Sequence, residues 1–239
     1  MRINLALPPD TADSFVREVD ENLRRDQAAD FAKRYGALIA TAVVLFLLAV
    51  AGYLYWQSRQ RANAEAATEQ LATTLQDVGA GRVAAAPAKL EALEKSDADG
   101  VRATAALSRA ALALQQNNRK LAATIYSGIA ADSGLAKPYR DLATVRGTAL
   151  EYDALKPDEV IARLQPLATP GEPFFGSAGE MIGMALIAKN QKPAAAQLFA
   201  KIAADKGAPP SLRSRAVQMA GSLGIDASAS LPTGAAAAE

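Results

Sequence analysis

The longest apolar stretch of the chain lies near its N-terminus. Residues 36–57 carry no charge and are apolar almost throughout. About 20 helical residues cross the roughly 30 Å hydrocarbon core of a bilayer, so the stretch predicts one transmembrane helix. Aromatic rings at the ends of such a helix prefer the membrane interface. The expected interface anchors are Tyr35 at one end and Tyr53, Tyr55 and Trp56 at the other.

Two other interpretations of the apolar stretch are possible. A buried core helix of a soluble protein is normally shorter and less uniformly apolar. A cleaved signal peptide has its apolar region close to the N-terminus, whereas here 35 residues precede it. In addition, Arg59 and Arg61 separate the stretch from a cleavage-like Ala-Asn-Ala at residues 62–64. We therefore expect a retained membrane anchor in contact with lipid.

Basic residues flank the stretch unequally. Those close before it are Arg24, Arg25, Lys33 and Arg34, and those close after it are Arg59 and Arg61. Basic residues are enriched on the cytoplasmic side of membrane proteins. The imbalance favours a cytoplasmic N-terminal segment, residues 1–35, followed by a single pass, with the large C-terminal part on the far side.

The segment before the membrane has an amphipathic pattern. Phe15, Val19, Leu23 and Phe31 fall on a four-residue spacing, and charged residues occupy the other faces. This pattern predicts a juxtamembrane helix. The helix either rests its apolar stripe among the lipid headgroups or docks on a cytoplasmic or membrane partner, and the sequence leaves both interpretations open.

Residues 58–223 show helical rather than alternating periodicity, with prolines before several Ala- and Leu-rich stretches. Four segments can be placed in register, at offsets of 36, 38 and 35 residues: 85–94, 121–130, 159–168 and 194–203. Each has a small or β-branched residue at its second position and large apolar residues at its sixth and ninth positions. Another small residue stands twelve residues before the second position. This pattern predicts stacked helix hairpins.

The matched positions form four sets. The sixth position holds Leu90, Tyr126, Leu164 and Phe199, and the ninth holds Leu93, Ile129, Leu167 and Ile202. The second position holds Ala86, Ala122, Val160 and Ala195, and the preceding small position holds Thr74, Ala110, Thr148 and Gly183. Small residues let two helices approach closely, and the large residue one turn later fills the space between hairpins.

This spacing of two small residues and one aromatic residue resembles the tetratricopeptide repeat. The best copy runs from Gly183 to Ile202, whereas the third copy departs from the pattern at Glu151 and at Pro166, which interrupts the second helix. We therefore predict an all-α fold: a juxtamembrane amphipathic helix, one transmembrane helix, and an α-solenoid of tetratricopeptide-like hairpins over residues 58–223.

The layout of the whole chain adds a second resemblance. Segments 14–26 and 33–36, the single span and the divergent repeats together resemble the bacterial inner-membrane family of ancillary Sec translocon subunits. The resemblance implies a non-catalytic protein of the inner membrane with a cytoplasmic N-terminus and a periplasmic repeat domain. It also implies protein partners: translocon subunits, periplasmic chaperones or unfolded, emerging chains. The repeats are similar as well to those of a periplasmic cell-division coordinator, so an envelope or division scaffold is the alternative.

Composition excludes most kinds of chemistry. The 239 residues include no Cys and no His, which excludes thiolate and imidazole metal sites, cysteine nucleophiles and Ser-His-Asp triads. A net charge of +1 gives no electrostatic footprint for nucleic acid. Acidic pairs such as Glu91 and Glu94 are typical of solvated helix faces. We expect no catalytic, cofactor-binding or metal-binding residues and no small-molecule substrate, so an enzyme is a distant third class of function.

The partner-facing side chains of this repeat come from the first helix of each hairpin. Counted from the small residue, the candidates are Leu107, Leu114, Val145, Tyr152, Met184 and Ile187. They either belong to the core or to a surface that the next repeat covers, or they form an exposed apolar trough for an unfolded segment or an amphipathic helix. The last residues, 224–239, are of low complexity and predict a disordered Ala-rich tail.

Overall fold

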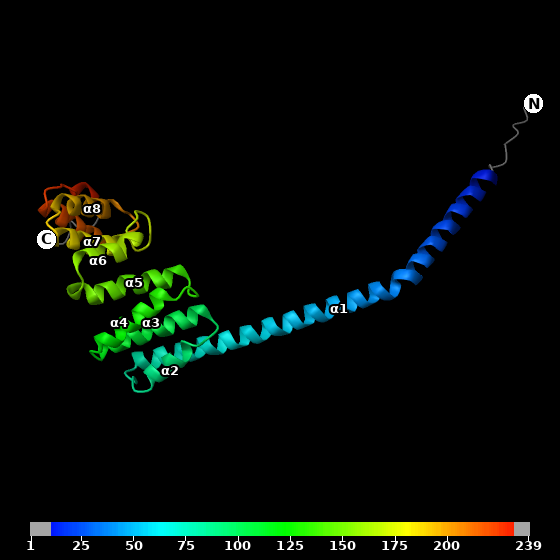
Figure 1. Ribbon diagram of the computed structural model, residues 1–239, viewed down its shortest axis with the longest axis horizontal. Helices are drawn as coiled ribbons and strands as arrows, with labels where there is room; N and C mark the ends of the chain where they lie inside the picture. The colour runs from blue at the N-terminus through cyan, green and yellow to red at the C-terminus, as the bar shows by residue number, and fades with distance from the viewer. Residues whose placement is uncertain (1–10, 232–239) are drawn as a thin grey trace, which may run out of the picture. The chain divides into compact units, whose positions relative to one another are not determined.

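The structure, a computed structural model, describes the backbone of residues 11–231, with side chains from residue 25 onward apart from residues 26–28 and 32. Every regular element in this part of the chain is helical, which confirms the predicted all-α fold (Figure 1). The α-helices are α1 (Thr11–Gly79), α2 (Ala86–Leu93), α3 (Asp99–Gln115), α4 (Arg119–Ala131), α5 (Lys137–Glu151), α6 (Pro157–Leu164), α7 (Phe175–Ala188), α8 (Lys192–Ala204) and α9 (Pro210–Ser222). Short 3-10 helices are η1 (Tyr152–Ala154), η2 (Gln165–Leu167) and η3 (Ser228–Ser230).

The chain divides into two compact units, Met1–Ala62 and Asn63–Glu239. In the first unit, the predicted juxtamembrane helix and the predicted span are parts of the single unbroken helix α1. Gly36 and Gly52 are the glycines within its apolar part. An isolated glycine costs a helix only about 1 kcal/mol relative to alanine, so neither ends α1.

The apolar part of α1 is long and hydrophobic enough to cross a membrane. Its most apolar 18-residue window has a mean hydropathy of 2.5, and none of that window is buried by the protein. Side chains such as Leu38 and Phe46 are 68% and 67% exposed, as a lipid-facing helix requires. Of the predicted amphipathic stripe, the side chains of Phe15, Val19 and Leu23 lie outside the described residues.

The predicted interface anchors Tyr35, Tyr53, Tyr55 and Trp56 are all exposed on α1. Basic side chains accompany the rings at both ends of the apolar stretch. The guanidinium of Arg34 lies 5.9 Å from the ring centroid of Tyr35, and that of Arg59 lies 5.6 Å from the ring centroid of Tyr55. Arg59 Nε also donates a hydrogen bond to the Tyr55 hydroxyl at 3.2 Å. Both ends therefore pair an aromatic ring with a cation, a combination suited to the headgroup region.

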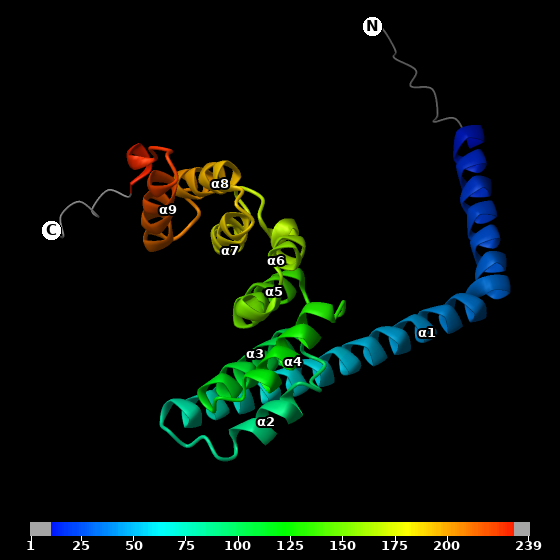
Figure 2. The same cartoon turned by 60° about the vertical axis from the view of Figure 1, so that its left-hand side comes forward.

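The second unit is a stack of helix hairpins in chain order. The last part of α1 packs on α2 and α3, and then α3 packs on α4, α5 on α6, α7 on α8 and α8 on α9. Figures 1 and 2 show the same succession from two directions. Each helix contacts mainly its neighbours in the sequence, which is the arrangement of an α-solenoid.

The repeat register predicted from the sequence is confirmed by burial. The sixth-position residues Leu90, Tyr126, Leu164 and Phe199 are at most 2% exposed. The residues at the other matched positions are buried as well, including the polar Thr74 and Thr148 at 2%. Thr74 satisfies its hydroxyl by donating a hydrogen bond to the carbonyl of Gln70 at 2.7 Å. The hairpins therefore share one packing scheme.

Close packing explains the small residues in this scheme. A Cβ added at Gly183 would lie 2.6 Å from Cζ of Phe199, so α7 and α8 can approach only because this side chain is absent.

The third hairpin departs from the others where the sequence indicates. α6 ends at Leu164, and Pro166 lies in η2 directly after it. Pro166 cannot continue an α-helix without losing a backbone hydrogen bond.

Residues 224–231, the first part of the predicted disordered tail, lie against the last helices. Ala227 is 8% exposed in the core around α8 and α9. Arg213 of α9 binds the segment by donating a hydrogen bond from Nη2 to the carbonyl of Ser230 at 2.7 Å. It also donates from Nε to the carbonyl of Ala203 in α8 at 2.9 Å. The low-complexity composition of the segment gives no indication of these hydrogen bonds. The remaining tail residues, 232–239, lie outside the described part of the chain.

Candidate protein-binding surface

The six predicted groove residues do not line one common surface. Leu107 and Leu114 pack against the core of α3 and α4, and Ile187 packs against the core of α8 and α9. Val145 and Tyr152 belong to the core around α6 and α7. Of the six residues, Met184 alone is exposed, at 44%. Their use as a partner-binding trough stays a prediction.

Tyr152 joins two hairpins. It lies in η1, and its hydroxyl donates a hydrogen bond to the carbonyl of Met181 in α7 at 3.3 Å. Partial burial raises the pKa of Tyr152, and the negative charge of Asp153 raises it further. The neutral phenol is therefore the form that bridges the third and fourth hairpins.

Tyr152→Phe removes this bridge and leaves the ring in place. We expect the free energy of unfolding to fall by about 1 kcal/mol, the usual net value of one hydrogen bond. Urea unfolding of the detergent-solubilised chain, followed by circular dichroism, measures the change. Tyr53→Phe, on the exposed part of α1, is the matched control and leaves unfolding unchanged. An unchanged or higher stability of Tyr152→Phe would contradict the bridging role.

Three recesses recur at the same place in successive hairpins. The first recess, of about 420 Å³, is lined by residues of α1 and α2. The second, of about 300 Å³, is lined by α3, α4, the loop after α4 and Glu94, which directly follows α2. The third, of about 290 Å³, is lined by α4, α5 and α6.

The repeat register shows that the first and third recesses are equivalent. Thr74 and Thr148, which are 74 residues apart, occupy the same position in the first and third hairpins. The same shift carries Gln70, Thr73 and Lys89 of the first recess onto Thr144, Gly147 and Arg163 of the third. An ion pair recurs as well. Lys89 Nζ lies 3.3 Å from Oδ2 of Asp77, and Arg163 Nη1 lies 2.7 Å from Oε2 of Glu151, which is the residue equivalent to Asp77.

The third recess is covered by the helix that precedes its hairpin, and the second recess is bordered by the turn that follows α2. α4 covers the third recess with Ala123, Tyr126, Ser127 and Ala130. The contact is close, because a Cβ on Gly147 would lie 3.2 Å from Cβ of Tyr126. At the second recess, Glu94, which directly follows α2, accepts a hydrogen bond from Arg109 Nη2 at 2.8 Å.

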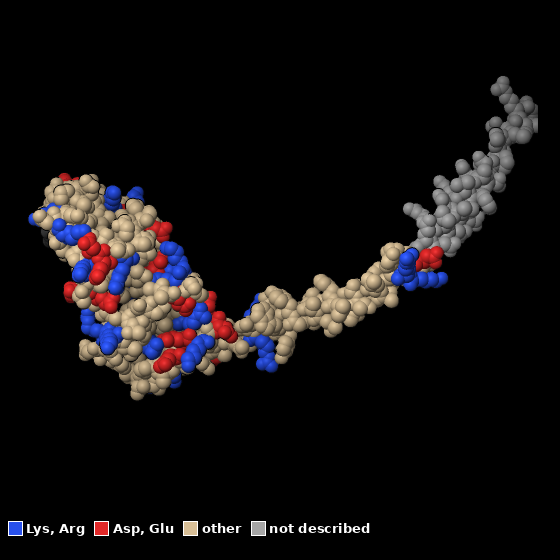
Figure 3. Space-filling view, viewed as in Figure 1, with Lys and Arg blue, Asp and Glu red and all other residues tan. Residues whose placement is uncertain are grey.

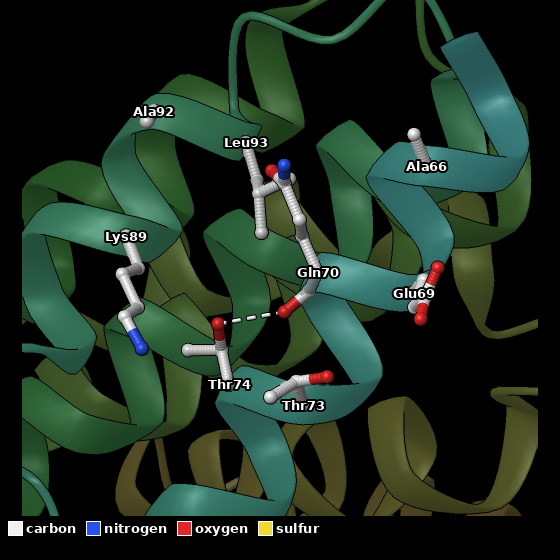
Figure 4. Close-up of a pocket in the computed structure, with 8 residues that line it drawn as sticks. All are labelled: Ala66, Glu69, Gln70, Thr73, Thr74, Lys89, Ala92 and Leu93. Carbon is white, nitrogen blue, oxygen red and sulfur yellow. Dashed lines mark hydrogen bonds between the residues drawn. The ribbon is translucent and has the colours of Figure 1, made fainter.

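The first recess has no such cover among the described residues. All its lining residues come from α1 and α2, as Figure 4 shows: Ala66, Glu69, Gln70, Thr73, Thr74, Lys89, Ala92 and Leu93. The first recess is therefore lined by its own hairpin alone, whereas α4 of the preceding hairpin contributes part of the lining of the third recess. This agrees with its larger volume.

Sequence reasoning missed the first recess, although the register contains its signal. Glu69 is exposed, whereas the residues at the same position in the next two hairpins, Ala105 and Ala143, are 0% exposed. A charged residue in place of a buried alanine marks the hairpin face that no helix in the described part of the chain covers.

Charges of both signs border the first recess. In Figure 4, Lys89 of α2 and Glu69 of α1 lie on opposite sides of the recess, with Thr73 and Thr74 between them. Near Lys89, Arg82 donates to the Asp77 carboxylate from Nη2 at 2.7 Å and from Nε at 3.0 Å. The hydrogen bonds from Arg82 and Lys89 hold the pKa of Asp77 below its usual value.

Arg82→Ala removes the larger cause of this shift, so we expect the pKa of Asp77 to rise toward its ordinary value. Because the folded-state pKa is lowered, the stabilisation from Asp77 is present above the ordinary aspartate pKa and is lost as the pH falls through the lowered value. An NMR titration of the Asp77 carboxyl group measures the shift, with Arg61→Ala as the control. An unchanged titration in Arg82→Ala would contradict the hydrogen-bonded arrangement.

The repeat domain presents a surface of mixed charge (Figure 3). The described residues contain no cluster of three or more acidic side chains that could hold a metal ion. On the face shown in Figure 3, Lys, Arg, Asp and Glu are interspersed over the repeat domain, without a large patch of one sign. Such a surface recognises partners by shape and local charge pairs rather than by a long-range field.

Comparison with known proteins identifies the repeat domain. A family described as "tetratricopeptide repeat-like domain" matches residues 29–220, which include the apolar segment of α1 as well as the stacked hairpins. No curated protein and no solved structure matches the chain. Domains of this kind are in general non-catalytic modules that bind other proteins. With four-fifths of its length matched, the chain belongs to the tetratricopeptide repeat-like domain family.

Proposed function

We propose that this protein is a non-catalytic, membrane-anchored interaction scaffold that serves as an accessory subunit of the Sec translocon. In this role its repeat domain links the translocon to periplasmic chaperones or to emerging chains. One observation carries the proposal: the single helix α1 contains both an apolar segment long enough to cross a membrane and the first helix of the repeat domain.

Chain length keeps the repeat domain near the membrane. Ten residues separate Trp56, at the end of the apolar stretch, from Ala66 in the first recess. Ten residues span at most about 35 Å even when they are fully extended. The first hairpin is therefore held close to the bilayer however the two units are arranged, and partners that it binds are recruited at the membrane.

The translocon role rests on the layout of the chain. The segments 14–26 and 33–36, the single span and the divergent repeats resemble those of ancillary Sec subunits. The family match begins at residue 29, before the span, so the membrane segment belongs to the matched pattern. In the bacterial inner membrane, the excess of basic residues before the span favours a cytoplasmic N-terminus and a periplasmic repeat domain.

A reporter fusion tests this topology. Alkaline phosphatase, which is active only outside the cytoplasm, is fused after Glu239 of the full chain, and in a matched second fusion after Lys33, before the span. We expect activity from the first fusion and none from the second. A stable but inactive fusion after Glu239 would contradict the cytoplasmic placement of the N-terminus.

Photo-crosslinking from the span tests the translocon role. A photoreactive residue at Leu47 or Leu48, both exposed on α1, is introduced one position at a time into the full chain in bacterial cells. We expect adducts with translocon subunits from the span and none from the matched position Gln76 on the repeat domain. Adducts with cell-division proteins and none with the translocon would support the envelope or division scaffold instead.

A further inference from the structure

We propose that the first recess binds an amphipathic helix of a second membrane-anchored protein, in the place that the last helix of a preceding hairpin would take. The inference rests on the proposed membrane scaffold, and it adds the site and the chemistry of the partner. The first recess is defined by Ala66, Glu69, Gln70, Thr73, Thr74, Lys89, Ala92 and Leu93.

Continuity with the stacking interface supports a helical occupant. The chain builds the same interface between successive hairpins, where α2 packs on α3 and α4 covers the third recess. The first recess has the same register and the same ion pair as the third, and it lies at the open end of that interface. Its volume is about 420 Å³, against about 290 Å³ for the third recess, to which α4 contributes part of the lining.

The helix that covers the third recess shows what the occupant must present. α4 places Tyr126 against α5, with small side chains three residues before it, one residue after it and four residues after it: Ala123, Ser127 and Ala130. Small residues around one large apolar residue allow two helices to approach closely. The contact point on α5 is Gly147, whose equivalent in the first recess is the exposed Thr73. The occupant therefore places its large apolar residue over Thr73.

The charge of the recess adds a second requirement. Ala130, near the end of α4, packs in the same core cluster as Ala143, whose equivalent in the first recess is Glu69. A residue of the occupant at the Ala130 position therefore faces Glu69, and a basic side chain there would pair with the carboxylate. A cation in the last turn of a helix is also favoured by the helix dipole. An ion pair between successive hairpins, with the opposite polarity, already exists at the second recess between Arg109 of α3 and Glu94, which follows α2.

The position of the recess along the chain favours a partner in the same membrane. The recess begins ten residues after Trp56, so it stays within about 35 Å of the span. A helix that adjoins another protein's transmembrane segment is confined to the same zone, which raises its effective concentration at the recess. The proposed occupant is therefore a helix close to the membrane rather than a freely diffusing unfolded chain.

A peptide with the sequence of the chain's own covering helix tests the recess directly. The probe is a helix-stapled, fluorescent peptide of residues 117–132 with the substitution Ala130→Lys, and the target is the full chain in detergent micelles. We expect saturable binding by fluorescence anisotropy. Thr73→Trp, which blocks the contact point, weakens binding at least tenfold, whereas Gln76→Trp, on the same helix but outside the recess, leaves it unchanged.

Charge reversal supplies a test that misfolding cannot mimic. Glu69→Lys weakens the Ala130→Lys peptide severalfold, and a peptide with Ala130→Glu restores the affinity for that variant. Absence of peptide binding, or equal binding to the wild type and to Thr73→Trp, would overturn the inference. Restoration by the reversed pair would support the predicted orientation of the occupant, and its failure would contradict that orientation.

In cells, a photoreactive residue at Thr73 identifies the natural occupant. We expect adducts within a helix that adjoins a transmembrane segment and carries one large apolar residue among small ones. The additional substitution Glu69→Lys should reduce this crosslinking. Adducts with a second copy of this chain, with a soluble chaperone or with unfolded chains would contradict it. If span adducts form with the translocon while Thr73 gives none, only this inference fails. If Thr73 gives the expected adduct and the span gives none, only the translocon role fails.

Discussion

Phe199→Ala is expected to lower the free energy of unfolding of the repeat domain by about 3–5 kcal/mol. Phe199 is 0% exposed and fills the core between α7, α8 and α9, with its ring against the space left by Gly183. Truncation leaves a cavity that the closely packed backbone of Gly183 cannot collapse to fill. Urea unfolding of the full chain in detergent, followed by circular dichroism at 222 nm, measures the loss.

The matched control is Met184→Ala, one residue from Gly183 on the same helix. Met184 is 44% exposed, so we expect a change of at most about 1 kcal/mol. The comparison separates burial at the repeat register from a general sensitivity of α7. Equal effects of the two substitutions would show that Phe199 does not hold the position in the core that the repeat register assigns to it.

The pair Val44→Asp and Leu48→Asp is expected to abolish membrane integration. Both side chains are exposed near the centre of the apolar stretch, on one face of α1. Each Asp costs about 2.5–3.5 kcal/mol at the centre of a membrane helix, whereas each Leu, Ile, Phe or Val contributes only about −0.3 to −0.6 kcal/mol. Residues 37–56 contain ten such apolar residues, so two central charges outweigh the eight that remain.

Extraction of membranes with alkaline carbonate measures the effect. The wild type stays in the pellet, and we expect most of the doubly substituted chain in the supernatant. Asn63→Asp with Gln76→Asp is the control, because it adds the same charges at exposed positions after the apolar stretch and leaves the chain in the pellet. Retention of the Val44→Asp and Leu48→Asp chain in the pellet would contradict a single transmembrane helix at residues 36–57.

Much of the fold could be predicted because it depends on local, periodic patterns. The register of Leu90, Tyr126, Leu164 and Phe199 follows from the sequence alone, and all four residues are buried. Each hairpin contacts mainly its neighbours, so one spacing rule describes the whole stack. Pro166 likewise ends the second helix of its hairpin for a reason that is visible in the sequence.

The features that could not be predicted depend on which surfaces meet. Of the six groove candidates, Tyr152 bridges two hairpins and Met184 is exposed. The spacing of apolar residues describes the face of a helix and does not say which helix covers it. Residues 224–231 are bound by Arg213, which donates a hydrogen bond to the carbonyl of Ser230. Arg213 lies in α9, outside the low-complexity segment.

The first recess could be predicted from the sequence only in part. Its register is visible in the sequence, because Glu69 stands where Ala105 and Ala143 stand in the next hairpins. Its openness is visible only in the structure, where α4 covers the equivalent surface of the third hairpin and no described helix covers this one. In a repeat protein, the interface between two internal hairpins therefore indicates what kind of helix the exposed face of the first hairpin can bind.

The most direct test of the central claim, a membrane-anchored interaction scaffold, is the size of the complex that contains the chain. Bacterial membranes that carry the full chain at its native level are solubilised in a mild detergent and separated by native gel electrophoresis. We predict that the chain migrates in an assembly much larger than its own 24.9 kDa, together with translocon subunits. Migration as a free monomer, or recovery of the chain in the soluble fraction without membrane extraction, would contradict the account.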